Sequence, residues 1–180
     1  MERRYLGVRH PMICNPIVID PLCRRENCWQ NRAWVLSDMS KQQASRAQLA
    51  ALPYRQVEGH LEVLLVTSRE TRRWIIPKGW AEKGTKPHDM AAREAFEEAG
   101  VRGKVRKCPH GSYRYEKRLT AKRSVACEVT VFLLEVEQEL ADWPEKGERE
   151  RRWLSPSQAA LDISESGLVA MLLSLGLPAT

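Results

Sequence analysis

The 180-residue chain has the length of one ordinary domain, or of one domain with an additional arm. Hydrophobic residues make up 43% and charged residues 29%, which suits a sizeable apolar core and argues against wholesale disorder. No apolar run approaches the roughly 20 residues of a membrane span, and residues 1–20 lack the apolar segment of a secretory signal. The odd count of 5 cysteines argues against a disulfide framework, so a cytoplasmic protein is expected.

The formal net charge of +6 favours anionic partners such as nucleotides, polyphosphates or nucleic acid. The charge is distributed unevenly: residues 67–87 and 111–124 are rich in lysine and arginine, and residues 135–150 are rich in acids. This pattern is compatible with solvated surface loops and equally with a site for a highly charged ligand. No aromatic-rich RNA-binding signature accompanies the cations, so nucleic acid is disfavoured as a partner and no membrane partner is expected.

Residues 1–45 differ from the rest of the chain. They contain three prolines and three of the cysteines, and no period of 2 or 3.6 is sustained. The sequence therefore predicts a poorly ordered N-terminal arm followed by one domain over residues 46–180. The spacing of Cys14, Cys23 and Cys28 matches no common zinc knuckle, so a zinc site is not favoured.

The predicted domain alternates strands with helices. Strands at 54–57 and 61–66 flank a hairpin turn at Glu58-Gly59-His60, and a short strand at 74–76 stops at Pro77. A loop over 78–86 leads into a helix that begins at Pro87 and ends with Gly100 as its cap. Further strands are expected at 104–107, 111–117, 124–136 and 151–154, with helices at 156–161 and 165–175. This order predicts a single α/β or α+β domain.

Three glutamates lie close together on the predicted helix. At about 100° per residue, Glu94, Glu97 and Glu98 fall within an arc of about 100°. The opposite side, which would pack on a sheet, carries Ala92, Ala95, Phe96 and Ala99. A solvated acidic face is a common explanation of such a cluster. The other is a divalent-cation site, because hard carboxylate oxygens suit Mg²⁺ or Mn²⁺ and these ions bridge to phosphates.

Residues 79–101 resemble the Nudix box, G-x5-E-x7-R-E-U-x-E-E-x-G-U, in which U is aliphatic. The matching positions are Gly79, Arg93, Glu94, Ala95, Glu97, Glu98, Gly100 and Val101. The resemblance covers about residues 50–165. It implies an α/β/α sandwich around a mixed sheet, with the box helix in the substrate cleft.

One box position departs from the pattern, because Thr85 stands where the family has its first glutamate. In the family that glutamate supports the loop and pairs with the box arginine, whereas the three helical glutamates bind the metal. Thr85 cannot supply the charge. Glu82, three residues earlier, is the candidate that could reach Arg93 instead.

Short motifs outside the box, at residues 64–74, 141–143 and 149–154, resemble the diphosphoinositol polyphosphate and diadenosine polyphosphate phosphohydrolase branch. The resemblance implies a metal-dependent hydrolase of phosphoanhydride bonds in nucleoside-diphosphate-linked or polyphosphorylated small molecules, with dinucleoside or inositol polyphosphates favoured. The alternative is a catalytically weakened nucleotide-binding or sensor protein. The expected catalytic residues are Glu97, Glu98 and Arg93; the Mg²⁺ or Mn²⁺ ligands are Glu94, Glu97 and Glu98; the substrate-binding residues are Arg72, Arg73, Lys78, Gly79, Arg114, Lys117 and Arg118.

Several residues near the box carry weaker expectations. The general base is a box glutamate or a carboxylate from a distant loop, with Glu116, Glu148 and Glu150 as candidates for the latter. Trp80 is expected to shield the sheet edge in preference to stacking on an adenine. His88 is expected to face solvent, and Cys108 and Cys127 to be small core residues.

Overall fold

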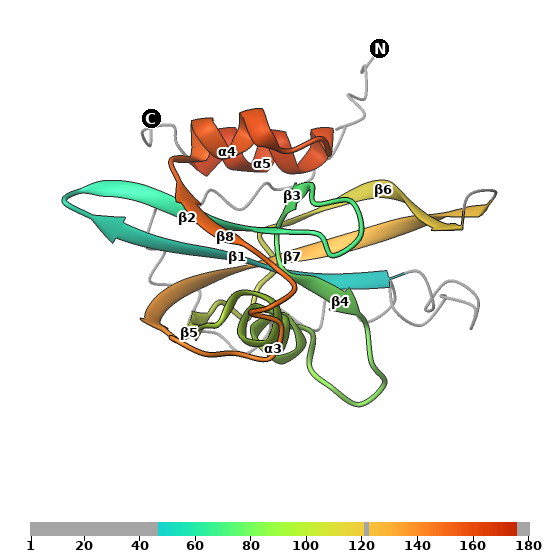
Figure 1. Cartoon of the computed structure of the whole chain (residues 1–180), viewed down its shortest axis with the longest axis horizontal. Helices are drawn as coiled ribbons and strands as arrows, with labels where there is room; N and C mark the ends of the chain where they lie inside the picture. The colour runs from blue at the N-terminus through green and yellow to red at the C-terminus, as the bar shows by residue number, and fades with distance from the viewer. Residues whose placement is uncertain (1–46, 121–122, 176–180) are drawn as a thin grey trace, which may run out of the picture.

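The structure is a computed structural model that describes residues 47–120 and 123–175, and Figure 1 shows it as a sheet covered by helices on both faces. Helix α3 (Pro87–Ala99) lies on one face, and α4 (Pro156–Asp162) and α5 (Ser166–Leu175) lie on the other. This is the predicted α/β/α sandwich. The predicted N-terminal arm, with its three cysteines, lies outside the described residues. None of the described helices is long and apolar enough to cross a membrane.

The described residues form a sheet of eight strands, whose central path runs β3-β2-β1-β7-β5. Strand β4 pairs with β1, β6 with β7, and β8 with β2. The pairing of β1 with β7 is parallel and the other described pairings are antiparallel, so the sheet is mixed as predicted. The strands are β1 (Ala47–Val57), β2 (His60–Thr67), β3 (Trp74–Ile75), β4 (Lys78–Trp80), β5 (Val101–Val105), β6 (Gly111–Thr120), β7 (Arg123–Glu139) and β8 (Arg151–Leu154).

The predicted hairpin between β1 and β2 is confirmed, with Val57 paired to His60 across a two-residue turn. Glu58 and Gly59 have positive φ angles of 50° and 80°, the geometry that matches the twist of the flanking strands.

Helix α3 has the bounds that the sequence predicts. Pro87 occupies its first turn, where the missing amide hydrogen costs nothing. Gly100 ends it with a left-handed φ of 65°, and its amide donates to the carbonyls of Ala95 and Phe96. The indole of Trp143 packs so closely on this turn that a Cβ at position 100 would lie 2.6 Å from its Cδ2 atom. Glycine is therefore required here for both backbone and packing reasons.

Strand alternation divides the core into two layers. On the α3 face, Leu64, Val66 and Phe132 pack against Met90, Ala91, Ala95 and Ala99 of the helix. On the other face, residues such as Leu52, Val63 and Leu133 pack against Leu168 and Leu172 of α5. The buried face of α3 differs from the predicted one, because it includes Met90 and Ala91 and leaves Phe96 only half-buried. The Arg102 Cζ atom lies 4.6 Å from the centroid of the Phe96 ring.

Three other local expectations were wrong. The predicted loop at 78–86 begins with β4, because residues 78–80 find partners in β1, a pairing that no local pattern reveals. His88 is buried with its ring centroid 6.4 Å from that of Phe132, because the first turn of α3 already covers the sheet. Cys127 is buried as expected, whereas Cys108 is only half-buried and follows β5.

Candidate active site

The three glutamates of α3 occupy different environments. Glu94 and Glu98 are buried against the sheet, whereas the Glu97 side chain is 42% exposed. They are four residues or fewer apart on one helix, so their negative charges repel one another. The acidic cluster is therefore not a uniformly solvated face, because two of its three glutamates are buried beside β4.

Glu94 lies directly against the backbone of Gly79. A Cβ at position 79 would approach Glu94 Oε1 to 1.9 Å, so the glycine makes room for the carboxylate. Burial raises the pKa of Glu94 to about 7, and the nearby charges of Glu98 and Glu97 add to the rise. Among the described residues, no ion pair or hydrogen bond neutralises this carboxylate. Glu94 is thus a buried acid whose ionised form a cation would stabilise.

Glu98 is held through both oxygens. Its Oε2 accepts a hydrogen bond from the Lys78 backbone amide at 3.1 Å, and its Oε1 forms an ion pair with Arg149 Nη2. Burial raises the pKa of Glu98, and the Arg149 guanidinium opposes that rise. The sequence alone predicts no role for Arg149, so its contact with Glu98 is a finding of the structure.

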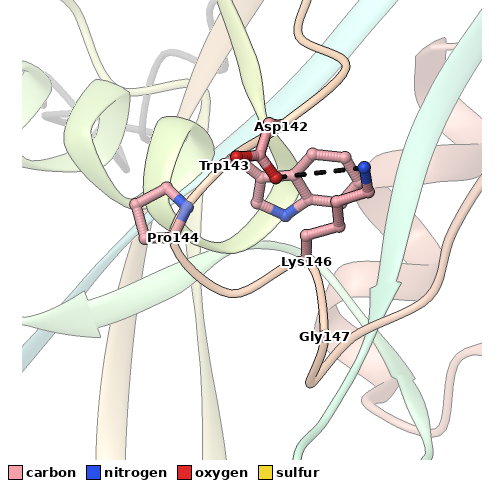
Figure 2. A pocket seen from close by; sticks show the side chains of 5 residues that line it. All are labelled: Asp142, Trp143, Pro144, Lys146 and Gly147. Carbon is pink, nitrogen blue, oxygen red and sulfur yellow. Dashed lines mark ion pairs between the residues drawn. The ribbon is translucent and has the colours of Figure 1, made fainter.

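Arg149 belongs to the loop formed by residues 140–150, which lies against the C-terminal end of α3. The Glu145 amide donates to the Glu97 carbonyl at 3.1 Å, and the Leu140 amide to the Gly100 carbonyl at 2.8 Å. These bonds satisfy helix carbonyls that lack partners within the helix. Figure 2 shows the shallow hollow on this loop, with Asp142, Trp143 and Lys146 among the residues that line it. Lys146 Nζ lies 3.9 Å from Asp142 Oδ1.

Arg93 projects on the other side of α3. Its Nη2 lies 2.6 Å from Glu82 Oε1, and its Nε lies 3.9 Å from Glu97 Oε1. The hydrogen bond to Glu82 raises the pKa of Arg93. The Thr85 amide bonds to the Glu82 carbonyl at 3.4 Å, which closes a turn before the helix. The contact proposed for Glu82 in place of the missing glutamate is therefore present.

Strand β4 separates two groups of predicted site residues. Alternation along it directs Gly79 toward α3, and it directs Lys78 and Trp80 toward the opposite face. There, Lys78 Nζ lies 5.5 Å from the ring centroid of Tyr115, and Lys117 Nζ lies 4.5 Å from that of Trp80. Burial lowers the pKa of Lys78 to about 8. We call Lys78, Trp80, Tyr115 and Lys117 the β4–β6 cluster.

Trp80 has a mixed environment. It lies on strand β4, as the shielding hypothesis requires, but it is 37% exposed and a lysine covers its ring. Tyr115, whose ring lies near Lys78, is not among the site residues predicted from the sequence. Its hydroxyl donates to Gln48 Oε1 at 2.6 Å, and the signal that could have identified it is its alternation with Lys117 on β6.

Of the remaining predicted substrate residues, Arg73 lies near enough to Tyr115 that its charge opposes the rise which burial gives the pKa of Tyr115. Arg72 and Arg114 make their contacts elsewhere. Arg72 Nη1 donates to the Glu148 carbonyl at 2.7 Å, and its Nη2 pairs with the Glu150 carboxylate. Arg73 Nε donates to Thr71 Oγ1 at 3.1 Å. The Arg114 side chain is 80% exposed, and that of Arg118 lies outside the described residues. The pairing with Arg72 also removes Glu150 from the position of an unpaired base.

The donor set at α3 fits a hard divalent cation, although the carboxylates do not converge in this conformation. Within residues 47–120 and 123–175, no group of three or more His, Cys, Asp or Glu side chains forms a ready metal cage. Glu98 faces Arg149 and Glu97 faces Arg93, which explains the divergence. The fit rests on Glu94, a carboxylate that lies against the backbone of Gly79 and whose pKa is raised by burial and by the charges of Glu98 and Glu97.

Comparisons with known proteins agree with this geometry. Residues 46–172 match the model of the NUDIX domain. Nudix hydrolase 13, mitochondrial, of Arabidopsis thaliana is 37% identical over 107 residues, which are 57% of this chain and 53% of the relative. Diphosphoinositol polyphosphate phosphohydrolase 3-beta of Bos taurus is 37% identical over 101 residues, 54% of this chain and 57% of that protein. A C. elegans Ap4A hydrolase structure, 17% identical, superposes with a TM-score of 0.54 over 72% of this chain and 93% of its own.

The chain therefore belongs to the Nudix hydrolase family, as its box predicts. The nematode structure supports the fold alone, because the sequence identity is low. The chain spans about half the length of the curated relatives that it matches first.

Proposed function

We propose that this domain hydrolyses phosphoanhydride bonds in a divalent-cation-dependent reaction. Its substrates are nucleoside-diphosphate-linked or polyphosphorylated small molecules, with dinucleoside and inositol polyphosphates favoured. The observation that carries the proposal is the arrangement around β4: three carboxylates lie on its α3 side and two lysines lie on the other. A chain of phosphates that crosses this strand would meet the cation and the lysines together.

Hydrolysis of a phosphoanhydride requires an in-line water, neutralised phosphate oxygens and a base. Glu94, Glu97 and Glu98 would hold Mg²⁺ or Mn²⁺, which supplies charge neutralisation and acidifies water when bound. Lys78 adds a positive charge, since a pKa of about 8 leaves it largely protonated at neutral pH. Glu97 is the carboxylate best placed to accept a proton, because the structure fixes both oxygens of Glu98 and buries Glu94.

The two favoured substrate classes make different demands on the β4–β6 cluster. Both present phosphates, which Lys78 and Lys117 can bind, but only a dinucleoside polyphosphate presents an aromatic base. Trp80, exposed beside Lys117, offers a ring on which such a base can stack. Stacking on an aromatic side chain contributes about 1–3 kcal/mol per base. Trp80→Ala should therefore raise KM for dinucleoside polyphosphates about ten-fold, with Trp80→Phe as the control, and leave KM for inositol polyphosphates nearly unchanged.

The test of the proposed function is a panel of nucleotides, dinucleoside polyphosphates and inositol polyphosphates, assayed for phosphate release with Mg²⁺ and with Mn²⁺. Glu97→Gln is the site variant to compare with the wild type, because this side chain is half-exposed and outside the core, so its loss should not unfold the domain. Turnover that requires the cation and Glu97 supports the proposal. A wild-type protein that hydrolyses no member of the panel would contradict it.

Thr85 motivates a second candidate, a sensor that binds nucleotides without turnover. The Glu82–Arg93 ion pair argues against a sensor, because Glu82 already supplies the carboxylate that pairs with Arg93 in place of the glutamate missing at position 85. Calorimetry separates the two candidates: a sensor binds a panel member with heat and releases no product.

We also propose a cytoplasmic location, on the odd cysteine count, and imaging of the tagged full chain tests it.

A further inference from the structure

Arg149 is a buried cation that reaches the box helix from a distant loop. Its side chain is 5% exposed, and all three of its donor nitrogens are engaged. Nη2 pairs with Glu98, Nη1 donates to the Thr67 carbonyl at 2.9 Å, and Nε donates to Glu145 Oε2 at 2.5 Å. The guanidinium therefore joins α3, the end of β2 and the 140–150 loop at a single point.

This cation lies where the proposed metal would act. Glu98 is one of the three carboxylates expected to hold a divalent ion, and the arginine already neutralises it. A guanidinium and a metal ion on one carboxylate repel each other, and this repulsion is strong in a poorly hydrated environment. Glu145, however, provides Arg149 with a second carboxylate. Arg149 can thus release Glu98 without being left as an unpaired buried charge.

We propose that Arg149 is a positioning residue that acts as the internal counter-ion of Glu98, and that a divalent cation binds this site in competition with it. The proposal rests on the proposed metal-dependent function. In the metal-free protein Arg149 holds Glu98 beside β4 and compensates its charge. When the cation binds, the Arg149–Glu98 contact weakens and the contacts of Arg149 with Glu145 and Thr67 remain. The arginine thereby holds the metal ligand Glu98 in place before the cation binds, and it lowers the affinity of the site for that cation.

The decisive measurement is Mn²⁺ affinity, followed through the electron paramagnetic resonance signal of the free ion. Arg149→Met should bind Mn²⁺ at least ten-fold more tightly than the wild type, because a competing positive charge is gone, while its metal-free melting temperature falls. Arg152→Met is the matched control: it removes an exposed arginine of β8 that pairs with Asp162, and Mn²⁺ affinity should not change. A purely structural role predicts the opposite, so equal or weaker binding by Arg149→Met overturns the proposal.

A second measurement uses the unmodified protein, in case Arg149→Met does not fold. The guanidinium resonances of Arg149, assigned through Arg149→Lys, should shift on titration with Mg²⁺, and the hydrogens on Nη2 should exchange with water faster. Resonances that stay unchanged at saturating Mg²⁺ overturn the competition. If the wild type and all variants bind no Mn²⁺, the proposed function fails together with this proposal. If they bind Mn²⁺ with equal affinity, only this proposal fails.

Discussion

Two loops contact helix α3, each through an arginine–glutamate ion pair. The two pairs differ chiefly in how far their side chains are exposed to water. Before α3, the 81–86 loop brings Glu82 to Arg93, with side chains 52% and 39% exposed. After β7, the 140–150 loop brings Arg149 to Glu98, with side chains 5% and 8% exposed. Exposed pairs contribute about 0–1 kcal/mol, whereas removing one member of a buried pair costs about 3–5 kcal/mol.

The difference assigns different tasks to the two pairs. The front pair, Glu82–Arg93, orients a half-exposed side chain and depends little on the rest of the fold. The rear pair, Arg149–Glu98, is tied to Thr67, Glu145 and the Lys78 backbone, so the fold and the site depend on it together. A substitution in the front pair should therefore change activity alone. A substitution in the rear pair should change stability as well.

The largest effect is expected at the helical glutamates. Glu97→Gln and Glu98→Gln should each lower turnover by on the order of a thousand-fold, or about 4 kcal/mol of transition-state stabilisation. Glu97→Gln should leave the melting temperature unchanged, because its side chain is half-exposed. Glu98→Gln should lower it, because Arg149 then loses a charged partner. Phosphate release and circular dichroism measure both properties, and near-normal turnover in both variants would remove the assigned site.

The two arginines provide the direct comparison of the pairs. Arg149→Met should lower the free energy of unfolding by about 3–5 kcal/mol, because Glu98 remains buried without its cation partner. Arg93→Met should lower it far less, because its pair with Glu82 is exposed to solvent. Urea unfolding in the presence of a chelator gives both values. Equal losses in the two variants would show that burial does not distinguish the pairs.

The front pair could be predicted from the sequence and the rear pair could not, for a physical reason. Glu82 and Arg93 are separated by one loop and one helix start, and the spacing of the box indicates that Arg93 needs an acid. Arg149 lies 51 residues from Glu98, in a stretch that is rich in acids and offers it carboxylates nearer in the sequence. Only the docking of the 140–150 loop on α3 brings the two together.

The same distinction holds for the fold. Helix α3 and the β1–β2 hairpin follow from local signals, namely a proline at the start of the helix and a glycine-containing turn between two alternating stretches. Strand β4 and the burial of His88 depend on pairing with β1 and on the position of the helix over the sheet. Local patterns contain neither piece of information. The β4–β6 cluster was missed in part for the same reason, since it joins two strands that are distant in sequence.

The pH dependence of stability offers a test of Glu94, which forms no ion pair within the part of the chain that the structure describes. The pKa of Glu94 is about 7 in the folded protein and has its ordinary value of 4.5 when the chain unfolds. Between these values the folded state retains a proton that the unfolded state releases, so stability should fall as pH rises through this window. The metal-free melting temperature should therefore decrease from about pH 5 to about pH 7.5, relative to Glu94→Gln. Parallel curves for the two proteins would show that Glu94 titrates normally.

The smallest effect is expected at Thr85, where the box departs from its family pattern. If Glu82 had left Arg93 unsupported, Thr85→Glu would raise kcat, by about ten-fold or ~1.4 kcal/mol. Because Glu82 Oε1 already lies 2.6 Å from Arg93 Nη2, the second carboxylate should change kcat by less than about two-fold. Glu82→Gln should instead lower kcat, and Thr85→Glu placed in that background should restore it. Mg²⁺ affinity should stay constant in all three variants, since neither residue belongs to the carboxylate cluster of α3. Steady-state kinetics over a range of Mg²⁺ concentrations tests this, and a rise of several orders of magnitude in Thr85→Glu alone would favour the sensor over the hydrolase.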